Sequence, residues 1–207
     1  MTPPRHKDTP STRIYILQQA APLFAKQGCN GVSMRDLSKA VDLSAAAIYH
    51  HFSDKKTLYL EVMKYVFLEK TSLIEKSIGS DGTALERLEM FVERFAQLLG
   101  GDSDYRALVL WALLDDDKSR VKLVAEDVFS PPFKSVKALV EEIDPEADHY
   151  MLTTSIVLLI VSHFATIPMS EYLPGWRSEY GQPEIVSKHV MEFLTQNTKL
   201  KANSEVE

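Results

Sequence analysis

The chain contains 207 residues, of which 45% are hydrophobic and 25% charged, the composition of an ordinary globular protein with one core of moderate size. Its net charge of −6 argues against a protein that coats DNA with its whole surface. The single cysteine, Cys29, excludes an intrachain disulfide and a multi-cysteine zinc site, and it is typical of a protein in a reducing cytoplasm.

The first ten residues are polar and contain three prolines, so residues 1–10 predict a disordered basic arm rather than a secretory signal. A helix is expected from residue 11, because apolar residues then recur at helical spacing until Gly28 ends the pattern. Pro22 lies off the apolar stripe. We therefore expect Pro22 to bend the helix slightly on its exposed side.

Residues 33–52 predict two short helices joined by a tight turn. Ser33 is placed to cap the first helix, with Asp36 completing a capping box, and Ser44 is placed to cap the second. Only three residues remain for the corner, and Asp42 tolerates the left-handed backbone that such a corner needs. This spacing is typical of a helix-turn-helix, whose second helix lies in a DNA major groove.

The charge distribution favours the same interpretation. Residues 1–60 contain eight Lys/Arg and four Asp/Glu, a net charge of +4, whereas the remainder contains fifteen and twenty-five, a net charge of −10. The basic excess therefore lies with the predicted helix-turn-helix, as expected of a segment that meets phosphates.

The rest of the chain predicts further helices and no strands, so the expected fold class is all-α. Helices are expected at 53–78, 83–101, 103–114 and 118–129, and, after a break at Ser130-Pro131-Pro132, up to about residue 143. The acidic run Asp115-Asp116-Asp117 is expected to be a solvated loop or a cap for the next helix. A loop at 169–182 and a last amphipathic helix from Pro183 complete the chain.

The segment from Asp144 to Pro168 needs a membrane check, because residues 149–170 contain no charged side chain and are long enough to cross a bilayer. The segment also contains several hydroxyl groups, and its flanks are acidic rather than rich in lysine and arginine. We therefore expect a buried or subunit-interface helix and no membrane partner.

Two stretches carry a family resemblance. Residues 37–52, with Lys55 and Leu58 beyond them, resemble the TetR-type repressor signature, and residues 16–28 resemble the helix that precedes it. Ser38, Asp42, Ala46 and Cys29 depart from the usual pattern. The resemblance implies four segments: a basic arm at 1–10, a helix-turn-helix DNA-binding domain at 11–52, a connecting helix at 53–78, and a helical ligand-binding and dimerisation domain at 79–200.

The predicted DNA contacts follow from the second short helix and its flanks. Its alanines allow a close approach to thymine methyl groups, Tyr49 and His50 are able to reach phosphates or base edges, and Arg35 a phosphate or a guanine. The resemblance assigns a phosphate contact to Lys55. The full predicted set is Ser33, Arg35, Ser44, Ala45, Ala46, Tyr49, His50 and Lys55.

The resemblance also implies an effector cavity and a symmetric homodimer on a palindromic double-stranded DNA operator. Aromatic residues of the larger domain are the candidate cavity lining: Phe91, Phe95, Tyr105, Trp111, Phe129 and Phe164. Residues on the last two long helices are the candidate interface: Leu152, Ile156, Leu159, His163, Val190 and Phe193. Few charges fall on inward faces, so an apolar or aromatic small molecule is the expected effector.

Two alternatives remain beside a cytoplasmic, ligand-released repressor. One is a ligand-binding sensor without a DNA role. The other is a helical-bundle metalloenzyme, because Glu146-Ala147-Asp148-His149 contains the Glu-x-x-His unit of di-iron bundles. Such a site needs two of these units and the chain has one. The sequence contains no Gly-rich phosphate loop or nucleophile elbow, so we expect no enzyme, cofactor or metal.

Overall fold

The computed structural model describes residues 11–79 and 81–197, apart from the side chains of residues 71–77 and 197. The predicted basic arm at 1–10 and the polar tail lie outside the described residues. The described part is all-α and has no strand. Its helices are α1 (Thr12–Gly31), α2 (Met34–Val41), α3 (Ala45–His51), α4 (Lys55–Ile78), α5 (Ala84–Gly101), α6 (Ser103–Leu113), α7 (Lys118–Val124), α8 (Ser130–Ile143), α9 (His149–Ser170) and α10 (Pro183–Asn197), with a π-helix η1 (Ala125–Phe129) and a 3₁₀-helix η2 (Ser178–Gly181).

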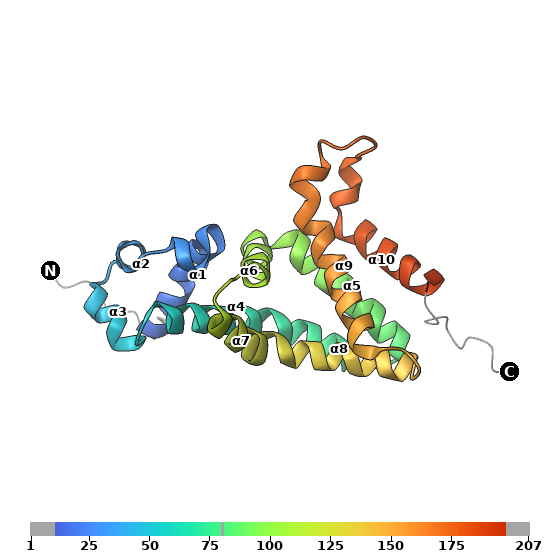
Figure 1. The fold of residues 1–207 in the computed structure, drawn as a ribbon, viewed down its shortest axis with the longest axis horizontal. Helices are drawn as coiled ribbons and strands as arrows, with labels where there is room; N and C mark the ends of the chain where they lie inside the picture. The colour runs from blue at the N-terminus through green and yellow to red at the C-terminus, as the bar shows by residue number, and fades with distance from the viewer. Residues whose placement is uncertain (1–10, 80, 198–207) are drawn as a thin grey trace.

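Helices α1, α2 and α3 form a small unit at one end of the molecule, which we call the reading head (Figure 1). Its core consists of apolar side chains that the helical pattern predicted, among them Leu37, Ile48 and Phe52. Helix α4 begins at the reading head and runs along the larger domain formed by α5 to α10 (Figure 1). A single helix therefore connects the two regions.

The regular part of α1 ends at Gly28 as predicted, where the chain kinks before a last helical turn up to Gly31. Gly28 has a φ of 64°, in the left-handed region that favours glycine. A Cβ at this position would lie 2.9 Å from ring atoms of Trp111 on α6. Gly28 therefore serves both the kink and the close packing of α6 on α1, while Pro22 lies on the exposed side as expected.

The predicted break at Ser130-Pro131-Pro132 is wrong. The π-helical segment η1 joins α7 to α8, and the two prolines fall in the first turn of α8. Two prolines would break a regular α-helix, and the wider π-helical turn of η1 just before them accommodates the change in hydrogen bonding. The chain therefore passes from α7 into α8 without leaving the helical conformation.

The acidic run after α6 is not wholly solvated. The carboxylate of Asp115 and the guanidinium of Arg120 form a buried ion pair, with side chains only 7% and 8% exposed. Asp117 caps α7 by accepting hydrogen bonds from Ser119 N and Arg120 N, both at 3.0 Å. Residues 115–117 form a loop as predicted and the prediction of a cap is confirmed at Asp117, but Asp115 is buried rather than solvated.

Helix α9 begins at His149, later than predicted, because Asp148 rather than Asp144 supplies the cap. Pro168 lies inside the helix, which continues to Ser170. Among the described residues, α9 is the one helix long and apolar enough to cross a membrane, and 28% of its most apolar 18-residue stretch is buried inside the protein. It packs against α5, α8 and α10, while Met151 and Met169 remain exposed.

Candidate DNA-reading face and ligand cavity

The surface of the reading head that carries the predicted DNA contacts, which we call the reading face, depends on local hydrogen bonds at the starts of α2 and α3. The Ser33 hydroxyl accepts from Asp36 N, and the Asp36 carboxylate accepts from Ser33 N at 3.0 Å. The Ser44 hydroxyl accepts from Ala47 N at 3.2 Å. Asp42 occupies the corner with φ 52° and ψ 40°, the left-handed conformation predicted for it. The two helices therefore meet in the geometry of a helix-turn-helix.

The negative charge of Asp36 stabilises the cap at the start of α2. Hydrogen bonds from the Ser33 hydroxyl and backbone hold the pKa of Asp36 below its ordinary value of 3.8. The carboxylate therefore remains charged at neutral pH at the start of α2, where the helix dipole favours a negative charge.

Six of the eight predicted DNA contacts are exposed on the reading head: Ser33, Arg35, Ser44, Ala46, Tyr49 and His50. Tyr49 is 49% exposed, although most large apolar side chains of the head are buried. Ala45 and Lys55 are half-buried, and Lys55 Nζ donates to Val32 O at 2.8 Å. Lys55 therefore holds its positive charge beside the start of α2 while also bonding the loop before it.

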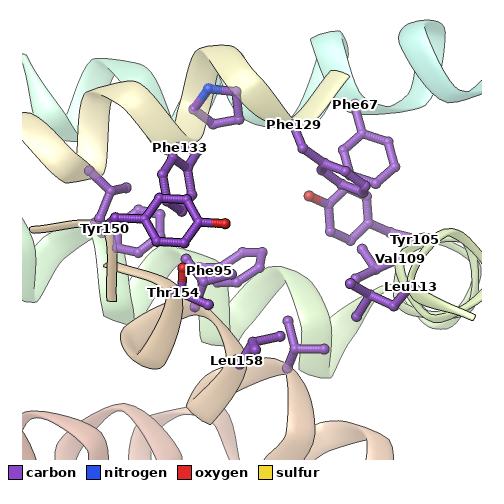
Figure 2. Close-up of a pocket in the computed structure, with 15 residues that line it drawn as sticks. Phe67, Phe95, Tyr105, Val109, Leu113, Phe129, Phe133, Tyr150, Thr154 and Leu158 are labelled. Carbon is purple, nitrogen blue, oxygen red and sulfur yellow. The ribbon is translucent and has the colours of Figure 1, made fainter. Parts of the chain in front are cut away.

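The larger domain contains a cavity of about 310 Å³ whose wall is almost wholly apolar (Figure 2). Four of the six predicted lining residues surround it, namely Phe91, Phe95, Tyr105 and Phe129. The other lining residues are Phe67, Val109, Leu113, Pro132, Phe133, Val136, Tyr150, Thr154, Val157, Leu158 and Val161. Helices α4, α5, α6, α8 and α9 all contribute, together with η1.

Trp111 and Phe164 lie elsewhere, which corrects two of the predicted lining residues. Trp111 points from α6 toward α1, where its Nε1 donates to Ala25 O at 2.9 Å. Phe164 lines a second, more polar cavity of about 420 Å³, which also involves Arg106 and Trp176. Helical spacing could not show the neighbour that each ring faces, and Trp111 is 40% exposed whereas Phe164 is buried.

Phe133 is a lining residue that the sequence prediction omitted. Phe129, Phe133 and Val136 lie four and three residues apart, the spacing of one helical face, so a helix running through the two prolines would have revealed it. The predicted break at these prolines concealed this pattern. Thr154 and Tyr150 were missed for another reason, since a polar residue on an apolar helix carries no periodic signal.

Helix α4 contributes directly to the cavity wall through Phe67. The Phe67 ring lies 4.6 Å from the ring of Tyr105 and 5.1 Å from that of Phe129, measured between centroids. These distances are typical of packed aromatic pairs. Thus α4 begins at Lys55 beside the reading face and carries a side chain of the cavity wall three turns later.

The predicted dimer contacts divide into three groups by their exposure in the protomer. Ile156 and Val190 are buried within the protomer, which corrects their assignment to an interface. Leu152, Leu159 and His163 are half-buried, and His163 Nε2 lies 2.9 Å from Tyr180 O. Phe193 is 48% exposed on α10. The face of α9 that contains Ile156 packs into its own subunit, because periodicity indicates which residues share a face but not where that face points.

The Glu-x-x-His unit has a structural explanation. His149 Nε2 lies 3.1 Å from Asp144 O, which ties the start of α9 to the end of α8. Within the part of the chain that the structure describes, no three His, Cys, Asp or Glu side chains are grouped as metal ligands. Burial raises the pKa of the Cys29 thiol, as expected of a thiol packed in a core.

These features define an all-helical protein with an N-terminal helix-turn-helix and a C-terminal helical domain containing a cavity. Residues 16–62 match the family model described as bacterial regulatory proteins, tetR family. The match covers the N-terminal part of the chain and shows that this part is similar to the tetR family of regulators.

Two curated relatives each match part of the chain. The icaADBC biofilm operon negative regulator IcaR of Staphylococcus aureus is 28% identical over 80 residues, which is 39% of this chain and 43% of IcaR. The transcriptional repressor KstR2 of Rhodococcus jostii is 34% identical over 67 residues, which is 31% of this chain and 33% of KstR2. The chain thus matches less than half the length of either relative.

Solved structures resemble nearly the whole chain. FadR of Bacillus subtilis, in complex with stearoyl-CoA, has a TM-score of 0.73 at 17% identity and covers 87% of this chain and 96% of its own. A regulator from Saccharomonospora viridis, in complex with choline, has a TM-score of 0.71 at 21% identity and covers 89% and 96%. At this level of identity the likeness shows the fold.

Proposed function

We propose that this protein is a cytoplasmic transcriptional repressor that binds a palindromic double-stranded DNA operator as a homodimer and releases it when a small apolar or aromatic effector enters the cavity. The observation that carries the proposal is the course of α4, which joins the reading face at Lys55 to the cavity wall at Phe67. We propose four segments: a basic arm at 1–10, a helix-turn-helix DNA-binding domain at 11–52, a connecting helix at 53–78, and a ligand-binding and dimerisation domain at 79–200.

Release follows from a two-state equilibrium. An effector lowers DNA affinity only if it binds more tightly to the conformation in which the two reading heads do not fit successive major grooves. Because Phe67 contacts both Tyr105 and Phe129 in the cavity wall, a ligand that displaces either ring also acts on α4. The two relatives are named as a negative regulator and a repressor, which supports repression rather than activation of transcription by the DNA-bound protein.

The homodimer is supported by apolar side chains left exposed on α9 and α10. Met151 is 57% exposed, Met169 61% and Phe193 48%. An apolar surface of this kind on a small protein favours association, and a two-fold dimer would present two reading heads to the two halves of a palindrome. Sedimentation of the full chain should give twice the protomer mass, and Met151→Glu should shift the equilibrium toward the monomer.

The reading face is tested by Tyr49→Ala. With Tyr49 half exposed, its loss should leave the fold intact and weaken binding to DNA selected from a random double-stranded library about 5- to 100-fold, the range for a lost base or groove contact. Tyr172→Ala is the matched control, because Tyr172 is 87% exposed on the larger domain. Equal affinities for the two variants would remove Tyr49 from the proposed site.

A further inference from the structure

Among the residues that the structure describes, the cavity lining contains no group that would neutralise a charged ligand. None of the fifteen described lining residues is Asp, Glu, Lys, Arg or His. Moving an unpaired charge from water into such a wall carries a large desolvation penalty. The wall therefore selects against both anions and cations in the part of the ligand that it encloses.

Three hydroxyl groups interrupt this apolar wall, those of Tyr105, Tyr150 and Thr154. Figure 2 shows the hydroxyls of Tyr105 and Tyr150 directed toward each other across the cavity. Neither these two hydroxyls nor that of Thr154 hydrogen-bonds to another group in the described part of the chain, although the neighbouring Thr153 hydroxyl donates to His149 O. The three hydroxyls are thus available to a ligand.

Tyr105 is the most enclosed of the three. Its side chain is 2% exposed, and its ring packs on Phe67 of α4. Burial, with a smaller contribution from the nearby negative charge of Asp102, raises the pKa of its phenol well above the ordinary value of 10. The phenol therefore stays protonated at neutral pH and presents an O–H donor to the cavity.

From these observations we propose that the cavity takes an uncharged, mainly apolar molecule that bears one oxygen acceptor, such as a ketone, and that the Tyr105 hydroxyl donates a hydrogen bond to this oxygen. The proposal rests on the effector-binding role given to the cavity above and adds the chemical class of the ligand. An enclosed donor without a partner costs free energy, so a ligand that supplies an acceptor gains affinity over one that does not.

Three probes of nearly equal shape separate the effect of the hydrogen-bond acceptor from the effect of charge on binding. 2-Acetylnaphthalene carries an uncharged ketone oxygen, 2-ethylnaphthalene lacks an acceptor, and 2-naphthoate carries a negative charge at neutral pH. Calorimetric titration of the full chain should give the ketone roughly 3- to 10-fold tighter binding than the hydrocarbon, the range for one uncharged hydrogen bond. The carboxylate should bind at least 10-fold more weakly than the ketone.

Tyr105→Phe assigns the hydrogen bond, because it removes the hydroxyl and keeps the ring. It should abolish the preference for the ketone over the hydrocarbon and leave the affinity for the hydrocarbon unchanged. Tyr180→Phe, which alters a tyrosine outside this cavity, is the matched control. Thermal melting checks that each variant folds, and Tyr105→Leu provides a second removal of the same hydroxyl if Tyr105→Phe does not fold.

Several outcomes would overturn the proposal: no binding of the ketone, binding of the carboxylate as tight as that of the ketone, or a ketone preference that persists in Tyr105→Phe.

Failure of the repressor proposal would give a different set of results. If the ketone binds with the predicted dependence on Tyr105 but DNA affinity does not change, the ligand class stands and ligand-controlled release is wrong. If the ketone does not bind while Tyr49→Ala still weakens DNA binding, the ligand class is wrong and the reading face stands.

Discussion

The side chains of the reading head are positioned by local contacts, whereas those of the cavity are positioned by contacts between distant parts of the chain. In the head, residues adjacent in sequence are fixed by caps three residues long, as at Ser33 with Asp36, and the side chains point to solvent. In the cavity, side chains from five α-helices and a π-helix meet and point inward. The difference indicates that the head is shaped locally, whereas its orientation and the cavity both depend on long-range packing.

That orientation depends on a seam between the head and the larger domain. On one side lie Ala25, Gly28 and Lys56, and on the other Trp111 and Ser119. Cys29 lies close enough to Arg120 for the guanidinium to oppose the rise in the thiol pKa, which places the buried Arg120 pair beside the seam. Breaking the seam should change stability and head orientation while leaving the caps of α2 and α3 intact.

The largest effect is expected for Asp115→Ala. It leaves the buried Arg120 guanidinium with only Asp117, 3.5 Å away, and removing one partner of a buried pair costs about 3 kcal/mol of unfolding free energy. Chemical denaturation of the full chain measures this loss. Asp116→Ala is the matched control, because Asp116 is exposed and should change stability little.

The same pair predicts a pH dependence. Arg120 lowers the pKa of Asp115 below its ordinary value of 3.8, so the pair contributes fully above about pH 4, the unfolded-state pKa of an aspartate. The contribution is lost as pH falls through the lower, folded-state pKa. The stability difference between wild type and Asp115→Ala should therefore shrink in acid. A difference that stays constant from pH 6 to pH 3 would show that the charge of Asp115 is not responsible.

A smaller effect is expected for Gly28→Ala. The substitution places a Cβ at a φ of 64° and 2.9 Å from the Trp111 ring, which should cost about 1–3 kcal/mol. Gly101→Ala is the control, since a Cβ there has no neighbour within 4 Å. If the two variants melted at the same temperature, the close packing of α6 on α1 would not contribute to stability.

The smallest effect is expected for Trp111→Phe, which removes the hydrogen bond to Ala25 O and keeps an aromatic ring at the seam. A loss of about 1 kcal/mol is expected from one hydrogen bond. Trp176→Phe, in the second cavity, is the matched control. Amide hydrogen exchange in α1 should rise in Trp111→Phe and not in the control, and equal exchange in both would contradict a role for the bond at the seam.

The sequence predicted features that depend on neighbouring residues. Both caps of the reading head and the left-handed Asp42 are confirmed, because each requires contacts only three or four residues apart. Burial of Asp115 was missed, since its partner Arg120 becomes enclosed only when α7 packs on α4. The position of Trp111 was missed because its partner Ala25 is 86 residues away. Sequence periodicity indicates which face of a helix is apolar but not which surface that face meets.

The central claim is that occupation of the cavity weakens DNA binding through α4. The most direct test measures the affinity of the full chain for its selected DNA with and without saturating 2-acetylnaphthalene. We predict a weaker DNA complex with the probe bound and, by linkage, an equally large loss of probe affinity when DNA is bound. Equal DNA affinities with the cavity empty and occupied would contradict the claim.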